Sequence, residues 1–342
     1  MNTLESYSWK RRSNATDYVS RNIPVYLSKF YSYLSYVTIL AAAAVIVMML
    51  LSFPIGAIAF YDGRLGSSHS EVVEFPAFLF GLPLGLISGI TLGDAFGGLW
   101  VLYLVLFVIA LNGPLSSVTE MIRRTKNPVR SISRNQAVSI VVAFSSVYLL
   151  STIIELVQQS YGVRSGSLSE TNPLVAFVTV SLAPLTEEIG FRVSTIGFFA
   201  FAVVSSRAGP LMGIRALWHT ERYLRRVTKG RGNLRTLYSI AVVSGLFFGF
   251  AHLLYGGGWE IGKVSTASLA GITLGVMYIK FGIPSAILMH WSFNYFRSAF
   301  FFFGNSSPGF SLTDVVDIIV LIAGVTSVIL IVTSLISSLR GK

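Results

Sequence analysis

The chain has 342 residues, of which 53% are hydrophobic and only 12% charged, whereas a typical soluble domain has about 25% charged residues. Water is therefore not the main solvent of this chain. Cysteine is absent, which excludes disulfides, thiolate metal ligands and a cysteine nucleophile. The net charge of +11 comes from Lys and Arg residues that are not interleaved with stacking aromatics, as a nucleic-acid groove would require. We expect no nucleic-acid partner.

The basic residues are concentrated in four segments: residues 1–30, 113–134, 206–235 and the C-terminal end. An excess of Lys and Arg in short loops marks the cytoplasmic side of a membrane protein. Residues 1–35 are therefore expected to form a basic cytoplasmic segment. The first 30 residues contain no short apolar stretch followed by a cleavage site, so we expect no removable signal peptide. The pattern predicts a multi-pass protein of the plasma membrane, with both termini cytoplasmic.

Apolar runs long enough to cross a bilayer, which takes about 20 helical residues, recur along the chain. They predict spans at 36–60, 98–112, 135–157, 173–205, 236–256, 265–281, 284–303 and 313–338. The predicted fold class is all-α, a polytopic transmembrane helical bundle of about eight spans. Residues 36–338 would form this single domain, and 206–235 would be its largest loop, basic and cytoplasmic.

The apolar segment 76–97 does not fit this count. It contains Pro76 and Pro83, and its glycines recur with a strict spacing of four, at Gly81, Gly85, Gly89, Gly93 and Gly97. Glycine at this spacing lets another helix approach closely. We expect a glycine-rich re-entrant segment; the alternative is a ninth crossing, which would break the charge rule at 113–134.

Ionisable residues within a span are costly and are therefore candidates for function. The span from 173 contains Glu187, Glu188 and Arg192. Adjacent residues on a helix point about 100° apart, whereas Glu188 and Arg192, four apart, can pair on one face. Glu187 is left as the candidate general base that activates water. The alternative is a buried ion-pair cluster that only joins helices.

Two of the four histidines lie within predicted spans, each with a partner one helical turn away: Phe248 with His252, and His290 with Asn294. His252 could share a water with Glu187, while His290 and Asn294 could donate hydrogen bonds to an oxyanion. The predicted boundaries separate the two histidines by about 15 Å in depth. Their pairing therefore requires helix tilt or different boundaries.

A metal is the alternative to a glutamate-activated water. Glu187, His252 and His290 would make a typical catalytic set for zinc or another divalent metal, with one open position. The sequence does not separate a metal-bound water from one activated by glutamate alone. A site-2-type metalloprotease is disfavoured because no H-E-x-x-H motif occurs.

The motifs E-E-x-x-x-R, F-x-x-x-H and H-x-x-x-N, in this order on successive hydrophobic segments, closely resemble the CPBP family of intramembrane proteases. This family includes the type II CAAX prenyl endopeptidases and bacterial proteins linked to bacteriocin self-immunity. The resemblance covers residues 173–303, about 40% of the chain. It implies that Glu187 activates water alongside His252, that Arg192 organises the paired glutamates, and that His290 and Asn294 stabilise the oxyanion.

Two residues depart from the family pattern. Val193 stands where the family commonly has glycine, and Gly190 stands where it usually has a larger apolar residue. Both departures would change helix packing near the site, and neither removes a reactive group.

The predicted function is that of an intramembrane endopeptidase, a hydrolase acting on a membrane-associated peptide or lipidated protein. A prenylated, CAAX-type peptide is the substrate implied by the eukaryotic branch of the family, and membrane lipids are the other expected partners. The first alternative is a non-catalytic membrane binding or immunity protein that keeps these residues as a polar core. The second is a proton-coupled transporter, which internal repeats would favour; we find none.

Overall fold

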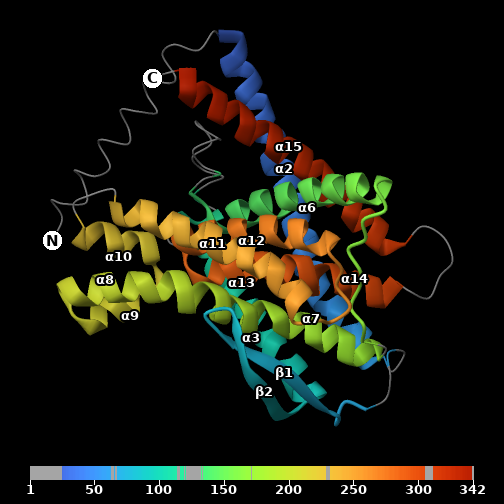
Figure 1. Ribbon diagram of the computed structural model, residues 1–342. Helices are drawn as coiled ribbons and strands as arrows, with labels where there is room; N and C mark the ends of the chain where they lie inside the picture. Colours follow the sequence, from blue (N-terminus) through green and yellow to red (C-terminus); the bar gives the residue numbers. More distant parts are fainter. Residues whose placement is uncertain are drawn as a thin grey trace.

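The computed structural model describes residues 25–62, 65, 68–113, 116–118, 120, 132, 134–170, 172–228, 232–304 and 311–340. Apart from loops and one hairpin, this part of the chain is helical (Figure 1). The predicted all-α class is therefore confirmed. Before the site, the elements are α2 (Val25–Tyr61), β1 (Val72–Leu79), β2 (Leu82–Thr91), α3 (Leu92–Asn112) and α6 (Gln136–Ser160). The elements that follow are α7 (Pro173–Glu188), η1 (Ile189–Gly197), α8 (Phe198–Ala208), α9 (Pro210–Trp218), α10 (Thr220–Val227), α11 (Gly232–Leu254), α12 (Gly262–Phe281), α13 (Ile283–Trp291), η2 (Ser292–Phe296), α14 (Arg297–Gly304) and α15 (Leu312–Arg340).

Seven helices in the described ranges are long and apolar enough to cross a membrane by length and composition. They are Ser32–Tyr61, Leu92–Asn112, Gln136–Ser160, Pro173–Ala208, Gly232–Leu254, Gly262–Phe281 and Leu312–Ile336. They correspond to seven of the eight predicted spans, and the remaining one, 284–303, is formed by α13, η2 and α14. The chain is therefore a multi-pass integral membrane protein.

The segments between the spans differ more from the prediction. The predicted loop 206–235 contains two short helices, α9 and α10, which lie beside α8 in Figure 1. The basic N-terminal segment up to residue 24 and most of the basic segment 113–134 lie outside the described residues.

Capping residues explain where the spans start and stop. The Asn135 side chain accepts a hydrogen bond from Val138 N at the start of α6, and the Asn172 side chain accepts one from Leu174 N at the start of α7. Asparagine is among the strongest N-cap residues because its side chain satisfies a free N–H. Between α12 and α13, Gly282 has φ of 89°, a conformation that glycine adopts without steric cost. Helix α12 therefore ends at Phe281.

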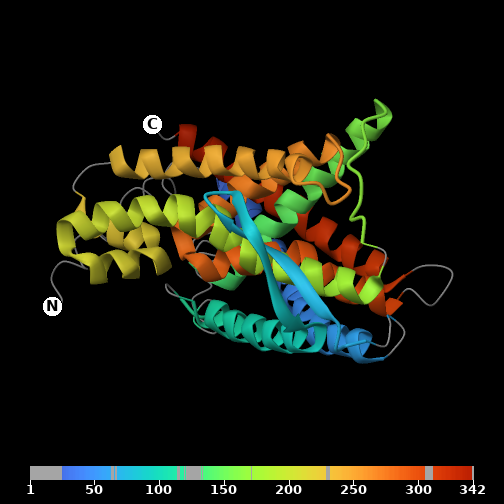
Figure 2. The ribbon, with the colours of Figure 1, turned by 60° about the horizontal axis from the view of Figure 1, so that its bottom comes forward.

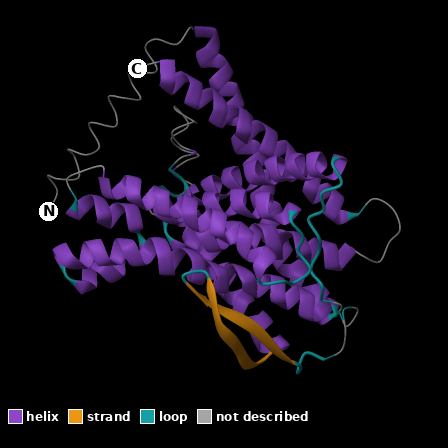
Figure 3. Cartoon of the chain, viewed as in Figure 1, coloured by secondary structure: helices purple, strands orange, loops and turns teal. Residues whose placement is uncertain are grey.

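Residues 76–97 do not form one helix. Strands β1 and β2 form an antiparallel hairpin, and α3 begins directly after it at Leu92. The two loop residues, Phe80 and Gly81, have φ of 51° and 77°, as a type I′ hairpin turn requires. Figure 3 shows this hairpin as the sheet of an otherwise helical structure. Because a hairpin returns toward its starting point, residues 72–91 are not a ninth crossing.

The hairpin lies across the outside of the helices, as Figure 2 shows, and β1 contacts α7 and η1. Gly81 N donates to the Gly190 carbonyl at 2.9 Å, and Phe80 N donates to Ser194 Oγ at 2.9 Å. The Tyr255 hydroxyl, just after α11, donates to the Gly81 carbonyl at 2.8 Å. These bonds fix the hairpin tip to the helices that carry two of the three motifs.

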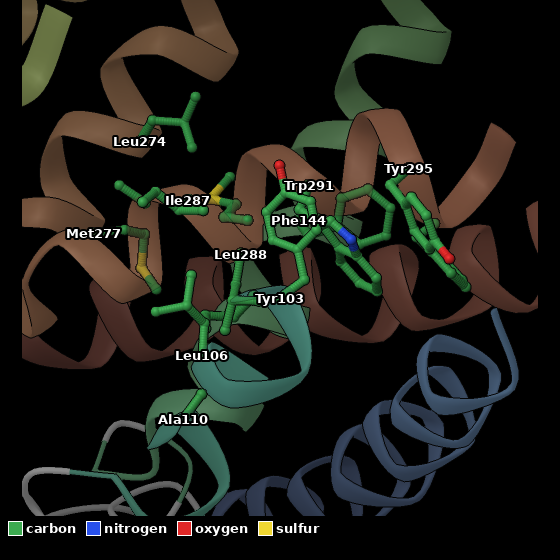
Figure 4. Packing of buried hydrophobic residues seen from close by; sticks show 14 of the residues in the cluster. Tyr103, Leu106, Ala110, Phe144, Leu274, Met277, Ile287, Leu288, Trp291 and Tyr295 are labelled. Atoms are coloured by element: carbon green, nitrogen blue, oxygen red, sulfur yellow. The ribbon is translucent and has the colours of Figure 1, made fainter. Parts of the chain in front are cut away.

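Aromatic packing forms the centre of the bundle (Figure 4). Trp291 is fully buried, and its ring stacks on Phe53 and Tyr295, each with centroids 5.4 Å apart. Such pairs contribute roughly 0.5–1.5 kcal/mol beyond their buried area. Tyr103 in α3 donates a hydrogen bond to the Ser181 carbonyl in α7. Because Trp291 directly follows His290, this core also fixes the backbone that carries His290.

Small residues bring α11 and α12 close together. A Cβ at Gly245 would overlap the backbone of Ile272, and one at Gly249 would overlap Ser268. Glycines at helix contacts allow backbones to approach closely in membranes. The side chain between them in sequence, Phe248, is therefore held against both α12 and η1.

Candidate active site

Two of the motif-bearing helices change from α to π geometry at the motif. Glu187 and Glu188 end α7, and Arg192 follows in η1; His290 lies near the end of α13, and Asn294 follows in η2. The π-helix is rare and is frequent at functional sites. In η1 the hydroxyls of Ser194 and Thr195 donate to the carbonyls of Gly190 and Phe191, and such bonds to the residue four positions earlier compete with regular α-helical pairing.

Glu188 is the fully buried member of the glutamate pair. Its Oε1 lies 3.0 Å from Arg192 Nη1 and 2.8 Å from His290 Nδ1. Arg192, also fully buried, donates from Nη2 to the Gly271 carbonyl at 3.1 Å. The predicted pairing of Glu188 with Arg192 is therefore present, and His290 joins it. An ionised carboxylate only accepts hydrogen bonds, so the short contact places a proton on His290 Nδ1.

Glu187 has a different environment from its neighbour. Its side chain is 21% exposed, whereas that of Glu188 is 0% exposed. Glu187 Oε2 lies 3.7 Å from His290 Nε2 and has no hydrogen-bond partner. One imidazole therefore faces both carboxylates through its two nitrogens, with a direct bond to Glu188 and a longer approach to Glu187. Glu187 remains free to bind a reacting group.

The Phe248 ring joins the remaining motif residues. Its centroid lies 4.8 Å from the His252 ring and 5.7 Å from the His290 ring, and both contacts are edge-to-face. The Arg192 guanidinium lies over the same ring at 4.3 Å, a distance at which a cation is attracted to an aromatic face. Both histidines flank one side chain, so the 15 Å separation inferred from the span boundaries is wrong.

His252 is oriented by its own helix. Its Nδ1 lies 2.9 Å from the Phe248 carbonyl. A carbonyl oxygen can only accept, so Nδ1 carries the proton and Nε2 of the neutral ring is an acceptor. Among the described residues, His252 forms no hydrogen bond or ion pair with Glu187 or His290; it approaches His290 through Phe248. Its free nitrogen is suited to accept a hydrogen bond from a water.

Asn294 is bonded to a neighbouring helix. Its Nδ2 donates to the Val180 carbonyl of α7 at 3.0 Å. Asn294 lies in the π-helical turn η2, whereas His290 lies in the preceding α13. Asn294 thereby ties η2 to the helix that carries both glutamates, and its second amide N–H is not used by this bond.

The hairpin explains one departure from the family pattern. A Cβ at Gly190 would overlap the side chain and backbone of Phe78 in β1. Glycine at this position therefore makes room for the strand, and a larger residue would push the hairpin away. Val193, the other departure, is partly buried and packs against the main core.

A metal does not fit the residues as they are arranged. No group of three His, Asp or Glu side chains in the described ranges is placed to hold an ion. Of the predicted ligands, His252 is bonded to the Phe248 carbonyl through Nδ1 and contacts the Phe248 ring rather than Glu187 or His290.

Lys263 and Trp259 are near the site and were missed by sequence reasoning. The Trp259 ring lies 6.1 Å from the His252 ring, and Lys263 Nζ lies 4.1 Å over the Trp259 ring. The predicted span began at residue 265, whereas α12 begins at Gly262. A lysine inside a span is a signal of function, and the boundary error concealed it.

The fold and the site together define a multi-pass membrane protein with a buried cluster of carboxylates, imidazoles and a guanidinium. Residues 169–296 match the family model described as Rce1-like, type II CAAX prenyl endopeptidase. This range contains all three motifs, and the match supports the membership of the CPBP family that the motifs predicted. At the level of the family, the match supports a membrane-embedded protease. Comparison with curated proteins and with solved structures gives no match.

Proposed function

We propose that the chain is an intramembrane endopeptidase that hydrolyses a peptide bond of a prenylated, CAAX-type membrane peptide through a water activated by Glu187. The difference between the paired glutamates carries this proposal. Glu188 is fully buried, and its Oε1 is bonded to both Arg192 and His290. The Glu187 side chain is 21% exposed and approaches only His290, at 3.7 Å; Oε2 of each glutamate has no hydrogen-bond partner. Glu188 is therefore suited to position other groups, and Glu187 to activate a water.

In the proposed reaction Glu187 accepts a proton from water while the water oxygen attacks the scissile carbonyl carbon. The carbonyl π electrons move to its oxygen, which becomes the oxyanion. When this intermediate collapses, the C–N bond breaks and the proton held by Glu187 passes to the leaving nitrogen. The products are a new carboxyl group and an amine, so atoms and charge balance. General base catalysis of this kind typically contributes about 10²- to 10⁴-fold.

The neighbouring groups have distinct tasks. His252 would orient the water through its acceptor nitrogen, Nε2. His290 is held by Glu188 through Nδ1, with Nε2 directed at Glu187. When the ring carries a second proton, Nε2 would donate it in a hydrogen bond to the oxyanion while Nδ1 keeps its bond to Glu188. Asn294 would donate its remaining N–H to the same oxygen. Oxyanion donors of this type are typically worth 10²- to 10³-fold in rate.

The test is cleavage of a quenched fluorescent farnesylated peptide by the purified protein. We expect Glu187→Ala to lower the rate by roughly 10²- to 10⁴-fold while leaving thermal stability unchanged. Glu74→Ala, which removes an exposed carboxylate from β1, is the matched control and should retain full activity. Equal cleavage by the wild type and Glu187→Ala would overturn the glutamate mechanism.

A chelator distinguishes the glutamate mechanism from the metal alternative. The proposed reaction uses only side chains of the chain itself, so EDTA should leave the rate unchanged. Loss of cleavage with EDTA, restored by zinc, would show that Glu187, His252 and His290 rearrange to hold an ion.

We also propose that the chain lies in the plasma membrane with both termini cytoplasmic. The support is the basic character of α9 and α10, which carry Arg215, Arg222, Arg225 and Arg226 and mark the cytoplasmic side. The absence of native cysteine allows a direct test with an impermeant maleimide. A cysteine at Gly257 should react in intact cells, and one at Arg222 only after permeabilisation; the opposite pattern would invert the topology.

A further inference from the structure

The loop between α11 and α12 is held in one conformation by backbone pairing. Gly258 O accepts from Ser167 N at 3.2 Å, Glu260 N donates to Ser165 O at 3.1 Å, and Gly262 N donates to Arg164 O at 2.9 Å. Gly258 has φ of 86°, and a Cβ there would overlap the Ser167 carbonyl. The loop is thus built against residues 164–169, and this arrangement determines where Trp259 and Lys263 point.

Both side chains are directed to the site. Lys263 Nζ lies 4.1 Å over the Trp259 ring, and that ring lies 6.1 Å from the His252 ring. His252 in turn contacts Phe248, which borders His290. The charge of Lys263 interacts with Glu187 and with Glu155 of α6. Lys263 is therefore a cation at the edge of the catalytic cluster.

Lys263 has no close anion. Among the described residues no carboxylate lies within 4.0 Å of its ammonium group, although Glu155 and Glu187 both act on it at longer range. It also stands in the first turn of α12, where the helix dipole disfavours a cation. A lysine at this position gains little from its helix, and a charge within a span is costly unless it is paired or functional.

We propose that Lys263 and Trp259 form a subsite that binds a carboxylate of the substrate, namely the free α-carboxylate at its C-terminus. This inference rests on the proposed peptidase function and specifies which peptides the site selects. An ammonium offers three donors to a carboxylate, and hydrogen bonds between charged groups are about twice as strong as neutral ones. The indole covers one side of the ammonium, so the carboxylate binds on a side that the indole does not cover. The site thereby favours scissile bonds near a chain end.

The experiment measures binding separately from cleavage. The probe is a fluorescent S-farnesylated peptide ending in Cys-Val-Ile-Met, prepared as the free acid and as the C-terminal amide. Binding of both forms to the full-length Glu187→Ala protein is measured by fluorescence anisotropy in detergent micelles. We expect the acid to bind roughly tenfold more tightly or better, the contribution of one charge-assisted hydrogen bond. Lys263→Met should remove this preference by weakening only the acid.

Two further variants test the assignment. Lys263→Arg keeps the charge and should retain most of the preference for the acid. Lys280→Met removes the exposed lysine at the other end of α12 and should change nothing. A peptide amide with a glutamate side chain at its last position distinguishes an α-carboxylate from any carboxylate; equal binding of this peptide and the free acid would overturn the assignment to the C-terminus.

The outcomes separate this inference from the proposed function. Equal binding of acid and amide by the Lys263-containing protein, or an equal loss of both in Lys263→Met, would overturn the carboxylate subsite even if the wild type cleaves the peptide. Conversely, an acid preference that depends on Lys263, without cleavage by the wild type, would support the subsite and refute the peptidase proposal for this peptide.

Discussion

Removing Arg192 should destabilise the fold far more than removing the whole ion pair. Arg192 and Glu188 are both 0% exposed and lie 3.0 Å apart. At that distance, with an effective dielectric constant of 20, their attraction is about 5.5 kcal/mol. Arg192→Met leaves the buried Glu188 with His290 as its remaining partner, and removal of one partner of a buried ion pair typically costs about 3–5 kcal/mol. The double variant Glu188→Met with Arg192→Met removes both charges and should recover most of that loss.

The assay is unfolding in mixed micelles, followed by tryptophan fluorescence, for the wild type, both single variants and the double variant. Additive effects would give the double variant the largest loss of stability, whereas interacting residues deviate from additivity. We expect the double variant to be more stable than Arg192→Met and yet to lack peptidase activity, because His290 loses the Glu188 bond that orients it. A fully stable Arg192→Met protein would refute the reasoning, since it would mean that Glu188 is not a buried anion.

Three further predictions concern the hairpin, the α11–α12 contact and His252. Gly190→Val should detach the hairpin tip, because a Cβ there overlaps Phe78; limited proteolysis should then cut between β1 and β2, whereas Gly98→Ala, with open space around its Cβ, should behave as the wild type. Gly249→Val should separate α11 from α12 at Ser268 and lower both thermal stability and activity; retained activity would show that the close approach is not needed. At His252, the amide of glutamine takes the place of Nε2 and that of asparagine the place of Nδ1. If Nε2 binds the water, His252→Gln should therefore keep more peptidase activity than His252→Asn. Higher activity of His252→Asn would indicate that Nδ1 binds the water.

The sequence alone determined the membrane class and most of the spans, and it predicted the motif residues of the candidate site. Long apolar runs indicate a span whatever surrounds them, since backbone groups in a bilayer must be satisfied within the segment. The pairing of Glu188 with Arg192 likewise depends only on helical spacing, and it is present. The three motifs predicted the family, because their order along the chain is a property of the sequence.

Tertiary contacts decided what local patterns left ambiguous. A glycine spacing of four places residues on one face of a helix, but it is also a multiple of the strand period of two. The segment around Gly81 and Gly85 therefore fitted either structure, and docking of the hairpin tip on Gly190 selects the strand. The same limit applies to Asn294, because helical spacing could not indicate its bond to the Val180 carbonyl of α7.

The environments of chemically identical side chains also come only from packing. Glu187 and Glu188 are adjacent glutamates, and the sequence could assign them different directions but not their partners. The structure buries Glu188 against Arg192 and His290 and leaves Glu187 partly exposed. Phe248, Trp259 and Lys263 join the site because α11, α12 and the connecting loop fold back on each other. Contacts between residues distant in sequence depend on how whole helices pack, and no local spacing encodes them.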